Sequence, residues 1–133
     1  MTSEKPYILK RWYEYMDKHD FTILDELLAE EVVFHSPVVH TPQRGKKITK
    51  IYLMAAEKVL GTGDFNYTKE ITSNQQIMLE FTTVIDGVTI NGVDIVTYND
   101  NNQITEFKVM VRPLQGMQKL HQQMMEMLAN FKK

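Results

Sequence analysis

The chain has 133 residues, the length of one ordinary domain, and is 43% hydrophobic, 10% aromatic and 24% charged, as soluble globular proteins are. Its 15 basic and 17 acidic residues leave a net charge of −2, which argues against binding of nucleic acid or anionic membranes. The absence of cysteine excludes disulfides and thiol chemistry. No long apolar run indicates a signal peptide or a membrane span, so we expect a single cytoplasmic domain over 1–133.

The first part of the sequence predicts three helices and a short strand. Apolar residues at three- and four-residue spacings indicate amphipathic helices over about 5–18, 21–30 and 47–60. The β-branched and aromatic segment 32–37 predicts a strand that ends at a proline. Residues 38–45, with a proline and a glycine, predict a loop.

After about residue 65 the hydrophobic period changes from that of a helix to that of a strand. Strands are predicted over about 65–72, 76–85, 88–99 and 103–112. The short connections between them, with a hairpin signal at Asp86-Gly87, predict an antiparallel meander. An apolar stripe then predicts a last helix. Helices followed by strands indicate an α+β fold, with helices packed on one face of a curved sheet.

Asp94 stands in the middle of an apolar strand. A period of two places it on one face with Gly92 and Val96. Aspartate is a poor strand former, so a specific interaction should hold it there. A carboxyl in an apolar pocket has a raised pKa, and in its protonated form it can donate a hydrogen bond to an oxyanion. The alternative is a structural aspartate, bonded to the backbone or paired with Arg11 or Arg112.

Residues 34–40 hold a second group of candidates. His35 and His40 could act as acid and base near neutral pH. Strand alternation turns Phe34 and Ser36 inward and His35 to the outer face or a subunit contact. His40 lies in a proline-flanked loop that could form the rim of a pocket or could simply be solvated.

Metal and cofactor chemistry have no support in the spacing of the histidines. Neither HxH nor HxxxH occurs, and no GxSxG elbow supports a serine triad, so we expect no metal and no cofactor.

The predicted strands are apolar on both faces, whereas a sheet with a solvated side alternates cleanly. We therefore expect helices on one face and a second copy of the chain on the other, in a homodimer.

Four stretches carry a resemblance to a known family: DFTILDELLAEEVVFHSPV (20–38), RGKK (44–47), GVDIV (92–96) and ITEFKVMVRP (104–113). From about residue 7 to residue 116 the chain resembles the SnoaL-like and ketosteroid-isomerase-like proteins of the nuclear-transport-factor-like superfamily. The resemblance implies a cystatin-like α+β barrel, in which a cone-shaped, curved antiparallel sheet wraps around N-terminal helices. It leaves the activity open, because this fold hosts isomerases, cyclases, dehydratases, epoxide hydrolases and non-catalytic binders.

Residue by residue, the resemblance is partial. Asp94 stands where ketosteroid isomerases keep the protonated aspartate of their oxyanion hole. Trp12 stands at the position where those enzymes have the tyrosine that shares this role. An indole N–H can donate a hydrogen bond, but it is not acidic as a phenol is. Ser36 stands at the position where those enzymes have the aspartate that acts as general base. Serine does not accept a proton at neutral pH unaided. The ligand-binding candidates are Trp12, Phe34, Ser36, Leu79, Phe81, Val96, Phe107, Val109 and Val111.

Two functions fit these residues. The first is an isomerase- or cyclase-type enzyme that moves a proton next to a carbonyl of a small hydrophobic molecule. Asp94 would then be the acid/base or oxyanion donor, and His40 the second catalytic group. The other is a non-catalytic small-ligand-binding or dimerisation module with a vestigial pocket. The inward carboxyl favours the enzyme, whereas the missing base at Ser36 favours the module.

Overall fold

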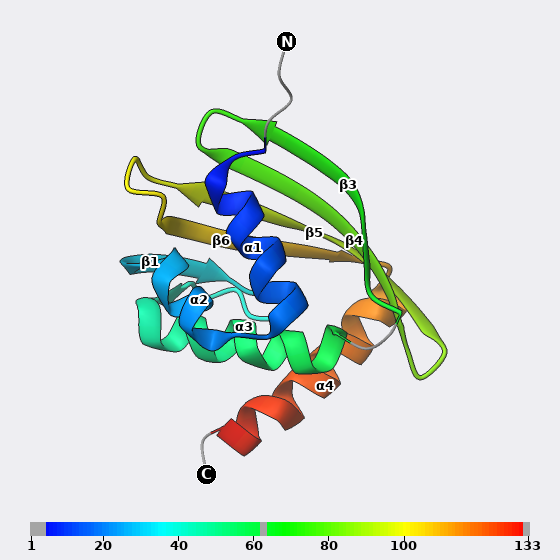
Figure 1. The fold of residues 1–133 in the computed structure, drawn as a ribbon. Helices are drawn as coiled ribbons and strands as arrows, with labels where there is room; N and C mark the ends of the chain where they lie inside the picture. Colours follow the sequence, from blue (N-terminus) through cyan, green and yellow to red (C-terminus); the bar gives the residue numbers. More distant parts are fainter. Residues whose placement is uncertain (1–4, 62–63, 132–133) are drawn as a thin grey trace.

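The computed structural model describes residues 5–61 and 64–131. Helices pack on one side of a strongly curved sheet (Figure 1). In chain order the elements are α1 (Tyr7–Lys18), α2 (Phe21–Leu27), β1 (Leu28–His35), β2 (Gln43–Arg44), α3 (Lys46–Leu60), β3 (Asn66–Ser73), β4 (Gln76–Ile85), β5 (Val88–Tyr98), β6 (Ile104–Arg112) and α4 (Leu114–Phe131).

The strands form one sheet in the order β2-β1-β6-β5-β4-β3. The meander from β3 to β6 is antiparallel, as the short connections predict. β1, which follows α1 and α2 in the chain, pairs with β6 in parallel. The short strand β2 pairs with β1 in antiparallel and forms that edge of the sheet. The sheet curves around the helices without closing, so the predicted α+β cone is confirmed as an open one.

Two boundaries in the first half differ from the sequence prediction. The second helix ends at Leu27 instead of continuing to about residue 30, and Leu28 already has the extended backbone that begins β1. A bulge in the β1–β6 ladder after Leu28 interrupts the two-residue alternation, so the apolar spacing of this stretch resembles that of a helix. The predicted loop contains β2. The third predicted helix corresponds to α3, and residues 62 and 63 after it lie outside the described chain.

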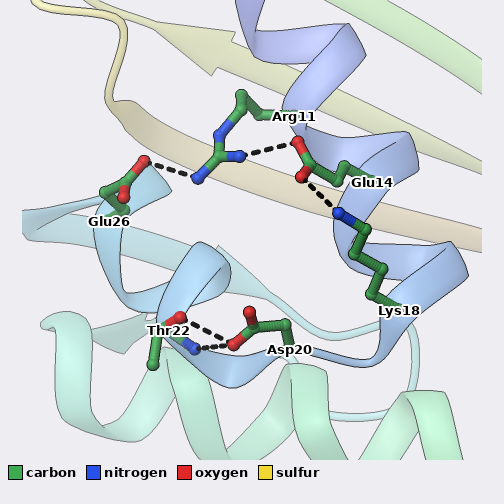
Figure 2. A network of polar contacts seen from close by, with 6 residues as sticks. All are labelled: Arg11, Glu14, Lys18, Asp20, Thr22 and Glu26. Atoms are coloured by element: carbon green, nitrogen blue, oxygen red, sulfur yellow. Dashed lines mark hydrogen bonds and ion pairs between the residues drawn. The ribbon is translucent and has the colours of Figure 1, made fainter.

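A polar network joins α1 to α2 (Figure 2). The guanidinium of Arg11 contacts the carboxylates of Glu14 at 2.6 Å and Glu26 at 2.8 Å. Asp20 caps α2, because its side chain accepts a hydrogen bond from the Thr22 backbone N–H at 3.0 Å. Ion pairs that solvent reaches contribute little to stability, so burial of the apolar faces is what mainly holds these helices against the sheet.

The outer face of the sheet carries apolar side chains among charged ones. Register places Ile71 beside Met78 on β4, and Met110 beside Val93 on β5. Glu80 on β4 is the partner of Val93 on the other side. Ile71 and Met110 are each 52% exposed. The expected homodimer through this face stays a prediction. Among the described residues, no helix combines the length and apolar character needed to cross a membrane.

The interior divides into two apolar clusters. One lies beneath α1 and α2 and includes Trp12, Phe34 and Phe107. The other lies beneath α3 and α4 and includes Phe81 and Leu120. Residues of both clusters face the space where they meet, and the candidate site lies there.

Candidate functional site

A cavity of about 60 Å³, partly open to solvent, lies between the two clusters. Its walls are almost entirely apolar, and the Trp12 and Phe107 rings meet on one side with centroids 5.2 Å apart. One buried water needs about 10–15 Å³ on this scale, and sites for drug-sized ligands span about 300–1,000 Å³. The cavity therefore suits a molecule of about one ring.

Asp94 brings a carboxyl to the cavity wall from the middle of β5. Its Oδ2 accepts a hydrogen bond of 2.8 Å from the Tyr67 hydroxyl, which comes from β3. That hydroxyl in turn accepts a hydrogen bond of 3.0 Å from the Trp12 indole N–H on α1. Three elements thus contribute to one chain of hydrogen bonds, which crosses the cavity wall and ends on the carboxyl.

Burial raises the pKa of Asp94 to about 7, and the hydrogen bond from Tyr67 opposes this shift. Burial, followed by the nearby Asp94 carboxyl, raises the pKa of Tyr67 well above its usual value, so its hydroxyl stays protonated and donates. Oδ2 already accepts from Tyr67, so we expect the neutral form to carry its proton on Oδ1. Near neutral pH the Asp94 carboxyl is therefore present in both its neutral and its charged form.

Neither arginine considered as a partner for Asp94 pairs with it. Arg11 is bound to Glu14 and Glu26 (Figure 2). The Arg112 guanidinium donates to Asn91 at 3.3 Å on the outer face. The carboxyl is thus held by a hydrogen bond from the phenol of Tyr67, and neither arginine stabilises its ionised form.

Gly92 is two residues before Asp94 and allows β5 to approach its neighbours. A Cβ at this position would lie 2.5 Å from Cζ of Phe81 and 2.7 Å from the backbone oxygen of Met110. We expect Gly92→Ala to lower the free energy of unfolding by about 1–3 kcal/mol, because the packed ring and strand must shift. Urea unfolding measures this. Thr89→Ala, at an exposed position of the same strand, should change it by less than about 0.5 kcal/mol. Equal stability of the two variants would contradict the tight packing.

The structure brings together most of the residues that the sequence analysis selected. On the cavity wall are Trp12, Phe34, Ser36, Phe81, Asp94, Phe107 and Val109. Leu79 and Val96 instead pack beneath α1, around a much smaller hollow. Val111 and His40 line an outer groove, which also includes His35 and meets the cavity only through Ser36, Pro37 and Val109. His40 is therefore not beside Asp94.

Sequence reasoning did not select Tyr67, Glu57, Tyr15 or Phe65, which also line the cavity. A bulge just after Tyr67 breaks the period of β3, and nothing local shows that the phenol reaches a strand two places along the sheet. Glu57 had a signal. It stands four residues after Leu53 and three before Leu60, so it shares the buried face of α3.

Within residues 5–61 and 64–131, no three His, Cys, Asp or Glu side chains gather as a metal site requires. The polar groups that hydrogen bonds connect to Asp94 are the phenol of Tyr67 and, through it, the indole of Trp12.

An open, curved sheet packed around helices is the architecture of the cystatin-like class of α+β proteins. A family model for the SnoaL-like domain matches residues 9–107, and the chain belongs to this family.

Solved structures agree with this assignment. A steroid delta-isomerase from Pseudomonas aeruginosa is 30% identical, with a TM-score of 0.87, and the match covers 93% of this chain and 90% of that one. An uncharacterised protein with a cystatin-like fold from Silicibacter pomeroyi is 26% identical, with a TM-score of 0.82 over 90% and 84% of the two chains. An NTF2-like protein from Mesorhizobium loti, at 20% identity and a TM-score of 0.68 over 80% and 88%, shares the fold. No curated protein matches the chain significantly in sequence.

Proposed function

We propose that this protein binds a small hydrophobic carbonyl compound in its cavity and catalyses an isomerase-type proton transfer next to the carbonyl. The observation that carries the proposal is the Asp94 carboxyl, 7% exposed on an apolar wall, with its pKa raised to about 7. Its neutral form donates a hydrogen bond from Oδ1 to the carbonyl oxygen. Negative charge gathers on that oxygen when the neighbouring carbon loses a proton, so the hydrogen bond strengthens in the transition state.

The hydrogen-bond chain supports the role of Asp94 as a donor. Trp12 donates to Tyr67, and Tyr67 donates to Oδ2, so the carboxyl is held at one oxygen while the other is left for the ligand. The apolar walls exclude water, which makes a hydrogen bond to a developing oxyanion stronger than it is in solution. The steroid delta-isomerase with 30% identity adds support for the reaction class.

The size of the cavity favours a substrate smaller than a steroid. A volume of about 60 Å³, in walls built from the Trp12, Phe34, Phe81 and Phe107 rings, accepts a single ring or a short chain. We therefore expect β,γ-cyclohexenone to be a better substrate than a β,γ-unsaturated ketosteroid.

The test is exchange of the α-protons of cyclohexanone and β,γ-cyclohexenone in deuterium oxide, followed by proton NMR. We expect Asp94→Asn to lower the exchange rate by about 100-fold to 1,000-fold, as loss of an oxyanion donor does, with the fold preserved. Asp100→Asn, in an exposed turn, is the matched control and should exchange at the wild-type rate. Equal rates in wild type and Asp94→Asn would overturn the proposal.

A non-catalytic binding module is the second candidate, favoured by two side chains that are already engaged. The Trp12 N–H donates to Tyr67, and the Ser36 hydroxyl accepts a hydrogen bond of 3.2 Å from the backbone of Val38. Saturable binding of cyclohexanone without any α-proton exchange would favour this module over the enzyme.

A further inference from the structure

A second carboxyl, that of Glu57, lies on the wall of the same cavity as Asp94. It comes from the last turn of α3, on the helix face that also buries Leu53 and Leu60. The Glu57 side chain is only 9% exposed. A carboxylate so far removed from water is costly unless its neighbours stabilise its charge, so its place on an apolar wall needs a physical reason.

Two neighbours hold the Glu57 carboxylate in place. The Tyr15 hydroxyl, from α1, donates to Oε2 at 2.6 Å, and Oε1 contacts Nδ1 of His19 on the solvent side. Burial raises the pKa of Tyr15 far above its usual value, so its hydroxyl keeps the proton and remains a donor. An ionised carboxylate has about four lone-pair sites, so these two contacts leave lone pairs that can accept a proton.

A continuous row of contacts along the cavity wall joins Glu57 to Asp94. Glu57 accepts from Tyr15, whose ring packs against that of Trp12 with centroids 5.3 Å apart. Trp12 donates to Tyr67, and Tyr67 donates to Asp94. All five residues line the one cavity. Because this cavity has room for about one ring, a ligand that fills it lies between walls that carry both carboxyls.

The proposed reaction needs a base, and the cavity wall offers few candidates. Among the residues that the structure describes, the titratable side chains on this wall are Tyr15, Glu57, Tyr67 and Asp94. Burial raises the pKa of both phenols, so they keep their protons and do not act as bases. Asp94, in its neutral form, is the donor to the carbonyl oxygen. Glu57 is therefore the group that remains to take up a proton.

We infer that Glu57 is the base of the proposed reaction, and that Tyr15 is its positioning residue. The inference rests on the proposed function, and it supplies the base that Ser36 cannot provide. A lone pair of the Glu57 carboxylate takes a proton from the carbon next to the carbonyl. The C–H electron pair forms a carbon–carbon double bond, and the carbonyl π pair moves to the oxygen that accepts from Asp94. In a β,γ-unsaturated ketone the γ-carbon of the dienolate then takes the proton back, which regenerates the carboxylate and the carbonyl.

The decisive variant is Glu57→Gln. Its amide has nearly the shape of the carboxylate, and its oxygen can still accept from Tyr15, but an amide does not accept a proton near neutral pH. We expect isomerisation of β,γ-cyclohexenone to slow by about 100-fold or more. Glu126→Gln, at an exposed position of α4, is the matched control and should keep the wild-type rate. A wild-type rate in Glu57→Gln would overturn the inference.

Chemical rescue separates a lost base from a damaged fold. Glu57→Ala leaves a gap in the cavity wall beside Tyr15, into which formate can diffuse. We expect added formate to restore part of the lost rate in Glu57→Ala and to leave the wild type unchanged. Formamide has a similar shape but no basic group, so it should restore nothing. Rescue by both compounds alike would show that the missing side chain filled space and did not accept a proton.

The positioning role of Tyr15 has its own readout. Tyr15→Phe keeps the ring and removes the donor to Oε2, so the carboxylate is free to turn away from the ligand. We expect kcat to fall about tenfold with KM unchanged. Tyr13→Phe is the control, because it removes a hydroxyl of the same helix that donates to Glu70 in the neighbouring groove. Equal kcat values in the two variants would contradict the role of Tyr15.

The two proposals fail in different ways. Loss of turnover in Asp94→Asn with wild-type turnover in Glu57→Gln would overturn the role of Glu57 and leave the proposed function standing. No turnover by the wild-type protein on either ketone would overturn both proposals.

Discussion

At about pH 8.5, Asp94→Asn should be more stable than the wild-type protein by about 4 kcal/mol, and the difference should vanish below about pH 4. Asp94 has a usual pKa of 3.8, which burial raises to about 7 in the folded protein. Each pKa unit corresponds to about 1.4 kcal/mol, so a shift of about three units gives this magnitude. It is a large part of the 5–15 kcal/mol that stabilises a typical domain.

The sign follows from which state binds the proton. Below about pH 4 the carboxyl is neutral in both states, and its burial carries no ionisation penalty. Between about pH 4 and 7 the unfolded chain releases the proton while the folded protein keeps it, so the wild type loses stability as the pH rises. Above about pH 7 the penalty is constant. Asparagine does not ionise and escapes it.

Urea unfolding of both proteins at several pH values measures this difference. Asp100→Asn, which changes an exposed carboxyl, should stay within about 0.5 kcal/mol of the wild type throughout. A wild-type protein as stable as Asp94→Asn at alkaline pH would mean that the folded carboxyl ionises as easily as the unfolded one.

Replacing Phe107 by alanine should lower the free energy of unfolding by about 3–5 kcal/mol, as it does when a buried aromatic side chain is removed. Phe107 is 1% exposed and lies between Trp12 and Phe34, with ring centroids 5.2 and 6.0 Å away. The two rings that remain are held by α1 and β1, so they cannot fill the space that the phenyl ring leaves.

Met110→Ala is the control for Phe107→Ala, because both positions are on β6. Met110 faces outward and is 52% exposed, so its removal should cost less than about 1 kcal/mol. The midpoint of urea unfolding should fall far more for Phe107→Ala than for Met110→Ala. Similar midpoints for the two variants would show that the space at Phe107 closes by collapse.

Which side chains of a strand face inward could be predicted from the sequence, because this alternation is a local property. Side chains alternate along a strand wherever the ladder is regular, and β4, β5 and most of β6 are regular. Asp94, Phe81 and Phe107 therefore share the inner face as predicted. The prediction was wrong at the end of α2, where Leu28 begins a strand and a bulge hides the change of period.

The polar half of the candidate site could not be predicted in the same way. The bond from Tyr67 to Asp94 joins residues 27 positions apart, and that from Tyr15 to Glu57 joins residues 42 apart. No local period encodes such pairs, because the first depends on the order of the strands in the sheet and the second on how α1 and α3 lie next to each other. His40 is the opposite case. Its residue type and its place near a candidate strand predicted a catalytic role, but the loop places it in the outer groove.

The place of β3 in the sheet has a consequence for how a ligand would reach the cavity. β3 is an edge strand, paired only with β4 and exposed along most of its length, yet it supplies the phenol that holds Asp94. Strand edges separate locally at a lower free energy than the centre of a sheet. A brief fraying of this edge would withdraw Tyr67, widen the passage and release the carboxyl together, without unfolding the helices. The same strand would then control both the opening of the cavity and the hydrogen bond to Asp94, so that entry of a ligand would coincide with the loss of a donor from the carboxyl.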